Sequence, residues 1–107
     1  MKKVLTLLFF IIVVLLIACD AKYKPVNGCE IRPKTECSRF VLSGTDLREA
    51  NLHGADLAYT DLLSADLRGA NLTWAHSNAE LAGAKYNKST KFHVGSDPEA
   101  AGMVLVE

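Results

Sequence analysis

Six leucines spaced five residues apart dominate the middle of this chain. They are Leu47, Leu52, Leu57, Leu62, Leu67 and Leu72, in a segment that reads TDLRE-ANLHG-ADLAY-TDLLS-ADLRG-ANLTW. Each leucine follows an Asp or Asn, which in turn follows an Ala or Thr. A period of five matches neither the 3.6-residue period of an α-helix nor the alternation of a flat strand. We therefore expect a chain that turns a corner once in every repeat.

The run resembles the pentapeptide repeat A(D/N)LXX, and the resemblance extends from about Phe40 to Phe92. The later segments AKYNKSTKF and SDPEAAGM also resemble the usual ending of such proteins. The resemblance implies an all-β fold, a short right-handed quadrilateral β-helix with one repeat on each side, four repeats in each coil, and capping segments at both ends. Leu fills the interior of such a coil, and the side chain of Asp or Asn bonds nearby backbone at the corners.

A coil of four repeats places residues that are twenty apart on neighbouring coils, with the spacing of adjacent strands, about 4.8 Å. The expected neighbours include the pairs Leu47 and Leu67, Asn51 and Asn71, and Arg48 and Arg68. We expect Glu49 to relieve the repulsion between the two arginines. We also expect Trp74 to stack over Gly54, which leaves room for its ring.

The repeat register breaks once, after Leu72. The next central residue that fits the pattern is Leu81, nine residues later instead of ten, so either one residue is missing or the chain cuts a corner near 74–76. Further on, Asp97 and the following Pro and Glu have the features of a helix start, and Gly102 would end this helix after about one turn. The apolar segment 103–106 is expected to fold back over the end of the array, because terminal repeats expose their stacking face.

Residues 1–18 have the pattern of a secretory leader, since two lysines precede an apolar run from Val4 to Ile17 that is short for a membrane-spanning helix. The leader ends in Leu16-Ile17-Ala18-Cys19, which resembles the lipobox of bacterial lipoproteins. This resemblance implies cleavage before Cys19 and a diacylglyceryl group on its sulfur, which with an N-acyl group would hold the protein on a membrane. The alternatives are an uncleaved anchor or core helix and an unmodified cysteine.

The residue after the lipobox bears on which membrane holds the protein. Asp20 resembles the inner-membrane retention signal of enteric bacteria, so the periplasmic face of the inner membrane is favoured, with the outer membrane as the alternative. Outside the reducing cytosol disulfides persist, so we expect a bridge between Cys29 and Cys37. A metal pair with His53 and two free thiols are the alternatives.

The chain accordingly divides into five segments. They are a lipoprotein signal peptide (1–18), a tether (19–28), a disulfide-bearing N-terminal cap (29–39), a pentapeptide-repeat solenoid (40–92) and a C-terminal cap (93–107). The whole chain has 12 basic and 12 acidic residues, and loss of the leader removes two lysines. Because the mature chain would be slightly acidic and has no basic patch, we expect no nucleic-acid partner.

The pattern suggests no catalytic set and no metal site. The three histidines, His53, His76 and His93, are expected on the solvated surface. The aspartates of the repeats could suggest cation binding, but their spacing puts successive carboxylates on different sides of the coil. Tyr59, Leu63 and Trp74 occupy outward positions, where apolar side chains mark a partner patch or pack against the caps and Gly54.

We therefore expect a non-enzymatic, membrane-anchored envelope lipoprotein that acts as a small rigid module for protein interaction or structural support. Its partners would be the membrane, through the lipid on Cys19, and an envelope protein; no other cofactor is expected. One alternative, taken from the family, is a protein that imitates DNA and binds a topoisomerase. Another is a cell-envelope enzyme, although a glycosidase would need two suitably placed carboxylates.

Overall fold

The computed structural model describes residues 25–75 and 78–107 of the chain. The expected signal peptide, Cys19, Asp20 and His76 lie outside these residues. Within the described residues the strands are β1 (Pro25–Val26), β2 (Cys29–Glu30), β3 (Lys85–Tyr86) and β4 (Val104–Leu105). The same part of the chain contains no helix long and apolar enough to cross a membrane.

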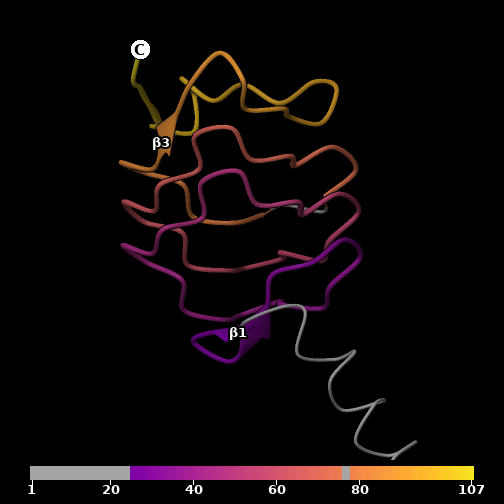
Figure 1. Ribbon diagram of the computed structural model, residues 1–107. Helices are drawn as coiled ribbons and strands as arrows, with labels where there is room; N and C mark the ends of the chain where they lie inside the picture. Colours follow the sequence, from indigo (N-terminus) through magenta and orange to yellow (C-terminus); the bar gives the residue numbers. More distant parts are fainter. Residues whose placement is uncertain (1–24, 76–77) are drawn as a thin grey trace, which may run out of the picture.

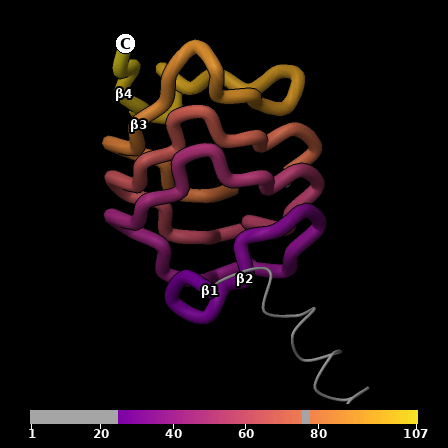
Figure 2. Tube along the Cα trace, viewed as in Figure 1, coloured from indigo at the N-terminus to yellow at the C-terminus, as the bar shows by residue number. Residues whose placement is uncertain are grey.

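The chain winds into coils that lie one above the other (Figures 1 and 2). Isolated parallel bridges join residues twenty apart on neighbouring coils. They pair Glu36 with Asp56, Val41 with Asp61, Asp46 with Asp66, and Asn51 with Asn71. The expected twenty-residue offset is therefore confirmed, and the hydrogen bonds of each coil run to its neighbours rather than within one long strand.

A tight turn forms the corner of each repeat. In one of them the carbonyl of Leu47 accepts a hydrogen bond from the N–H of Ala50 (3.2 Å), and Glu49, the third residue of the turn, has a φ of 59°. A positive φ at this place is what a type II turn requires. The same left-handed conformation recurs at every fifth residue: Lys34, Arg39, Gly44, Glu49, Gly54, Tyr59, Ser64, Gly69 and Trp74. The five-residue period is thus a period of corners.

The Asp or Asn of each repeat stabilises its own corner. The Oδ1 atom of Asp61 accepts a hydrogen bond from the N–H of Leu63 (3.0 Å), two residues later. The same bond is made by Asp46, Asn51, Asp56, Asp66, Asn71 and Asn87. A side chain that bonds backbone two residues on mimics a backbone turn. The corner role predicted for these residues is confirmed.

The interior of the coils is filled by the central leucines. Leu42, Leu47, Leu52, Leu57, Leu62 and Leu67 are 0–2% exposed. Small residues lie beside them, and where Thr replaces Ala at positions 45, 60 and 90 the hydroxyl donates to a carbonyl. Buried Thr60 donates to the carbonyl of Cys37 at 2.8 Å. The interior is therefore apolar while its few hydroxyls are satisfied.

The register break changes the offset between coils from twenty to nineteen. Asp61 pairs with Glu80 and Asp66 with Lys85, but Asn71 pairs with a residue twenty later, Lys91. One residue is missing before Glu80, as predicted, and the step from Lys85 to Lys91 takes six residues instead of five. This additional residue restores the twenty-residue offset and was not anticipated from the sequence.

The N-terminal end of the coils is a two-stranded hairpin. β1 pairs with β2 in antiparallel register, and the turn between them has positive φ at Asn27 and Gly28. Residues 25–28 are thus part of the hairpin, although they were assigned to the tether. A disulfide joins Cys29 to Cys37, and both residues are buried in the interior.

At the C-terminal end β4 pairs with β3 in parallel register, so the last strand adds to the stack. The preceding segment makes a single turn, in which Asp97 Oδ1 accepts a hydrogen bond from the N–H of Ala100 (3.1 Å). The N–H of Met103 bonds the carbonyl of Pro98 (3.0 Å), and Gly102 has a φ of 78°. The segment therefore closes as one turn and then returns as a strand.

Candidate functional site

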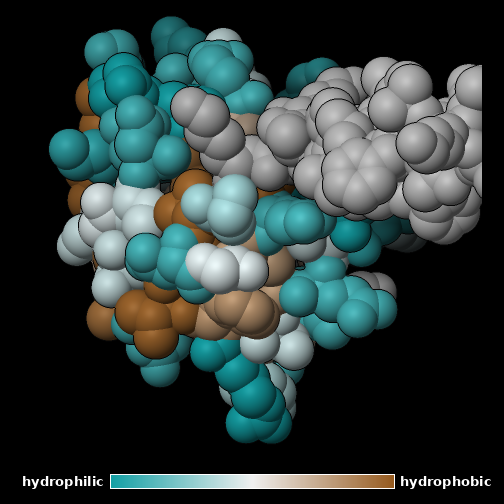
Figure 3. Space-filling view, turned by 60° about the horizontal axis from the view of Figure 1, so that its bottom comes forward, coloured by the Kyte–Doolittle hydropathy of each residue, from teal (hydrophilic) through white to brown (hydrophobic). Residues whose placement is uncertain are grey.

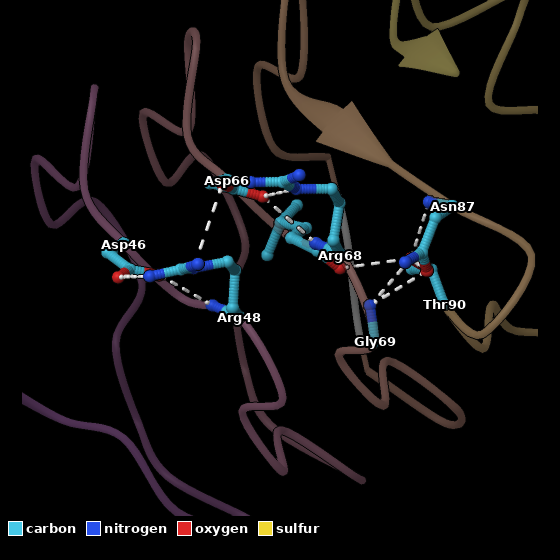
Figure 4. A network of polar contacts seen from close by, with 8 residues as sticks. Asp46, Arg48, Asp66, Arg68, Gly69, Asn87 and Thr90 are labelled. Carbon is cyan, nitrogen blue, oxygen red and sulfur yellow. Dashed lines mark hydrogen bonds and ion pairs between the residues drawn. The ribbon is translucent and has the colours of Figure 1, made fainter. Parts of the chain in front are cut away.

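Acidic and basic side chains line one side of the coils (Figure 4). Arg48 binds Asp46 of its own repeat through two hydrogen bonds, Nε to Oδ1 (2.8 Å) and Nη2 to Oδ2 (2.7 Å). One coil further, Arg68 binds Asp66 in the same way, at 2.8 and 2.6 Å. We refer to these four residues as the acid–arginine ladder. Each arginine is paired within its own repeat by a two-point contact, which is the stronger geometry for Arg and a carboxylate.

The pairing shifts the ionisation of all four groups. Hydrogen bonds from the Arg48 side chain and backbone lower the pKa of Asp46 to about 2, and the Asp46 carboxylate raises the pKa of Arg48. Arg68 likewise lowers the pKa of Asp66, whose carboxylate raises the pKa of Arg68. The ladder is therefore ionised at neutral pH and balanced in charge, so it forms no strong field for a charged polymer.

The expected role of Glu49 in this cluster is wrong. Among the ion pairs of the described residues, Arg48 uses Asp46 and Asp66, and Glu49 does not take part. Its carboxylate instead lies over Gly69, in the space that a Cβ at that position would occupy. Asp46 is two residues from Arg48, and its hydrogen bond to the corner backbone already orients its carboxylate. Arg48 therefore pairs with Asp46 rather than with Glu49.

The added residue near the end of the ladder is accommodated by side-chain hydrogen bonds (Figure 4). The N–H of Gly69 donates to Asn87 Oδ1 (3.0 Å) and Thr90 Oγ1 (3.2 Å). The hydroxyl of Thr90 in turn donates to the carbonyl of Leu67 (3.0 Å). These bonds connect adjacent coils where the regular offset changes, so this part of the side has a structural role.

The histidines of the described residues are engaged with neighbouring side chains. His53 Nδ1 lies 2.6 Å from Thr73 Oγ1, and the Thr73 hydroxyl donates to Asn71 Oδ1 (2.7 Å). His53, Thr73 and Asn71 are therefore linked by a chain of side-chain hydrogen bonds. His93 packs against Trp74, with 5.0 Å between the ring centroids.

The structure gives no support to a metal centre in residues 25–75 and 78–107. No group of three or more His, Cys, Asp or Glu side chains there is arranged to hold a metal ion. Of the three alternatives for Cys29 and Cys37, the disulfide is the one observed. A metal pair with His53 is therefore excluded as long as the bridge is present.

The three residues predicted as a partner patch are all exposed: Tyr59 by 61%, Leu63 by 36% and Trp74 by 66%. The Arg39 guanidinium lies 5.2 Å from the Tyr59 ring centroid, a cation–π contact. Leu63 follows Asp61, on the side that pairs with Val41 and Glu80, whereas Trp74 follows Asn71, on the side that pairs with Asn51 and Lys91. The structure therefore distributes these residues over different sides instead of joining them in one surface.

The expected stacking of Trp74 over Gly54 is also not found. The space beside the Cα atom of Gly54 is approached by the Lys34 side chain, and the Trp74 ring packs on His93. Trp74 is itself a corner residue with a φ of 60°. In Figure 3, which turns the N-terminal end toward the viewer, hydrophobic residues form small areas separated by hydrophilic ones.

A pocket of ≈ 390 Å³ opens at the C-terminal end of the coils. It is lined by interior residues of several repeats on both sides of the register break, including Leu57, Leu62, Leu72 and Leu81, and by the segment 92–98. Sequence reasoning did not identify this pocket. The signal that could have indicated it is the break itself, because the residue twenty after Leu57 is Ser77 and not a leucine.

Comparison with known proteins agrees with the repeat pattern. A sequence model of pentapeptide repeats matches residues 35–73 in eight copies. A pentapeptide repeat protein (Rfr23) from the cyanobacterium Cyanothece 51142 is similar in structure, with 33% identity and a TM-score of 0.50 over 56% of this chain. The match covers 45% of that protein, so this chain spans less than half of its length.

A second solved structure, alr5209, a pentapeptide repeat protein from Nostoc Pcc 7120, matches with 26% identity and a TM-score of 0.36. That match covers 68% of this chain and 82% of the Nostoc protein. No curated protein matches the sequence significantly.

Proposed function

Since residues 35–73 are pentapeptide repeats, we propose that this chain is a non-enzymatic, lipid-anchored module of the bacterial cell envelope. Its β-helix presents a rigid surface to an envelope protein or supports the envelope structurally. The observation that carries the proposal is the segment Leu16-Ile17-Ala18-Cys19 at the end of a short apolar leader. A thiol after a small residue is what lipidation and cleavage at this place require.

The disulfide supports a route out of the cytosol. Cys29 and Cys37 are each 1% exposed, and the bridge ties the hairpin to the first coil. Bridges of this kind form and persist in oxidising compartments. Asp20, directly after the lipobox, favours the periplasmic face of the inner membrane within this proposal, and the outer membrane is the alternative.

The proposal includes the finer form of the fold. Four corners for every twenty residues support a four-sided coil, and we take its hand to be right-handed, as the family resemblance implies. The segment 29–39 and the segment 93–107 act as caps, since the disulfide and the pairing of β4 with β3 bring each of them onto an end of the stack. Covered ends prevent the addition of further strands to an open edge.

A structural or binding role is also supported by the state of the carboxylates. The repeat aspartates accept hydrogen bonds from their own corners, and Asp46 and Asp66 are ion-paired in addition. An acid–base catalyst needs a carboxyl group within reach of a substrate proton and a pKa near the working pH. The lowered pKa of Asp46, to about 2, points in the opposite direction.

The test is the intact mass of the protein extracted from bacterial membranes, for the wild type and for Cys19→Ser. We expect the wild type to start at residue 19 with added lipid mass and with the mass of two hydrogens missing for the bridge. Cys19→Ser should remain unprocessed. A wild-type protein that keeps Met1 and fractionates with soluble proteins would overturn the proposal.

A second experiment addresses the partner. Photocrosslinking amino acids placed one at a time at Tyr59, Leu63 and Trp74 report which side of the coil is contacted in cells. Because these residues lie on different sides, a protein partner should be captured from one or two positions and not equally from all three. Equal capture at all positions would indicate contact without a defined surface.

A further inference from the structure

The pocket at the C-terminal end has the character of a ligand site. Its apolar lining includes the partly exposed side chains of Leu81 and Phe92, together with Leu72 and Met103, which are each 7% exposed. Polar groups lie at the opening, where His93 is half-buried and Ser96 and Asp97 are exposed. A concave apolar space of this size with a few polar groups at one end is the usual form of a small-molecule site.

The burial of the central residues shows independently that the interior opens here. The six central leucines from Leu42 to Leu67 are 0–2% exposed, whereas Leu72 is 7% exposed and both Leu81 and Phe92 are only half-buried. The interior is therefore less completely covered at its C-terminal end than in the middle of the stack.

We propose that this pocket binds a small neutral amphiphile with a single alkyl chain. The alkyl chain would lie against Leu72, Leu81 and Phe92, where it is removed from water. A hydroxyl or similar uncharged head would lie at the opening, within the region of His93 and Ser96. The carboxylate of Asp97 at the same opening disfavours an anionic head, so a fatty alcohol is expected to bind better than the fatty acid of equal length.

This inference does not depend on the lipid anchor or on the location of the protein. It follows from the shape of the repeat interior and from the polar groups at its opening. The test can therefore be made in whole cells that produce the full chain, wherever the protein resides.

The experiment uses two photoreactive probes of equal length, a medium-chain alcohol and the matching carboxylic acid, each with a diazirine in the chain and a terminal alkyne. Cells are irradiated, and the labelled peptides of the protein are mapped by mass spectrometry. We expect alcohol labelling to concentrate in residues 57–81 and 92–103. Labelling by the acid at the same peptides should be weaker.

A pair of variants makes the test specific. Ala79→Trp fills the pocket, because Ala79 lines it, whereas Ala82→Trp adds the same ring at an exposed position nearby that does not line it. We expect labelling to fall by about tenfold or more in Ala79→Trp, which corresponds to the loss of a modest binding free energy, and to persist in Ala82→Trp. Resistance of the Cys29–Cys37 bridge to reduction verifies that each variant is folded.

If Ala79→Trp does not fold, Leu81→Phe serves as a smaller filling substitution at the same wall. Labelling spread evenly over all peptides, or unchanged in a folded filling variant, would overturn the proposal. Stronger labelling by the acid than by the alcohol would overturn the assignment of a neutral head.

Discussion

The Nε atom of Arg48 lies 3.9 Å from Oδ2 of Asp66, which belongs to the next coil. Arg48 is also held by Asp46 of its own repeat at 2.7 Å. One guanidinium therefore contacts carboxylates of two successive coils. The twenty-residue offset places Arg48 and Arg68 on neighbouring coils. The repulsion between them is offset because Asp46 and Asp66 are stacked in the same manner.

The ladder should make part of the stability dependent on acid pH. The pKa of Asp46 is lowered from 3.8 to about 2. A depressed folded-state pKa stabilises the protein above the unfolded-state value, and this contribution is lost as the pH falls toward the folded-state value. The urea midpoint of unfolding should therefore fall between pH 3.8 and about 2, and by less in Asp46→Asn, which still has an oxygen to accept the bond from the N–H of Arg48.

Arg48→Gln is the matched variant for this prediction, because it removes the main cause of the shift and leaves the acid in place. Its midpoint should follow that of Asp46→Asn over the same pH range. If the wild type and both variants lose stability in parallel on acidification, the ladder does not contribute to the pH dependence.

Two corner glycines separate backbone strain from crowding. Gly44 and Gly69 both have positive φ, but a Cβ at Gly44 would meet nothing within 4 Å, whereas a Cβ at Gly69 would meet the Glu49 carboxylate. Gly44→Ala should cost about 1–2 kcal/mol of unfolding free energy, the cost of a left-handed conformation for an L-residue. Gly69→Ala should cost roughly 0.5–1.5 kcal/mol more, the scale of a side chain forced from its rotamer.

Urea denaturation of the two variants measures these costs. In a Glu49→Ala background the additional cost of Gly69→Ala should disappear, because the crowding group is gone. An additional cost that persists in that background would assign it to the backbone and not to Glu49.

The buried hydroxyl of Thr60 should contribute through a single hydrogen bond. It donates to the carbonyl of Cys37 at 2.8 Å, and this carbonyl otherwise accepts only a longer bond of 3.3 Å from the N–H of Phe40 among the described backbone contacts. Thr60→Val keeps the shape and removes the donor, so it should destabilise the fold by about 1 kcal/mol. Thermal unfolding of Thr60→Val and Thr60→Ser tests this, since Ser keeps the hydroxyl donor. A Thr60→Val variant as stable as the wild type would contradict the prediction.

The central leucines should differ in their importance along the stack. Leu57→Ala removes a residue that is 1% exposed and should cost about 2–5 kcal/mol, as large-to-small changes in a packed interior do. Leu81→Ala should cost less, because Leu81 is half-buried and already borders the pocket. Chemical denaturation of both variants measures the difference, and equal costs would show that the interior is as tightly packed at its C-terminal end as in the middle.

Much of the fold could be predicted because every repeat uses the same corner hydrogen bond and the same buried leucine. Asp61 bonds the N–H of Leu63, and Leu62 points inward, for the same reasons that apply in the neighbouring repeats. The register change at Glu80 was also readable, since it is a change of spacing. The compensating residue between Lys85 and Lys91 was not, because the chain there no longer follows the repeat and its hydrogen bonds come from Asn87 and Thr90.

The candidate sites could be predicted less well than the fold. The exposure of Tyr59, Leu63 and Trp74 followed from their outward positions, but their contacts did not. Trp74 packs on His93 and not over Gly54, whose open side is approached by Lys34 instead. The pocket is a space that side chains from several repeats leave unfilled. It could not be predicted from the sequence of any single segment.

The sequence alone determined the period of the corners and the identity of the interior residues, because these depend on hydrogen bonds and burial that repeat with the chain. The twenty-residue offset of the coils followed from the resemblance to pentapeptide repeats. The sequence predicted a bridge between Cys29 and Cys37, with a metal pair and free thiols as alternatives, and the tertiary structure confirms the bridge. Tertiary structure also decided that Arg48 pairs with Asp46 and Asp66 instead of Glu49, and that the interior opens beside Leu81. The physical reason is that the outward side chains of the repeats have several possible partners nearby. Which partner they bind depends on distances between coils, and these distances cannot be read from the sequence.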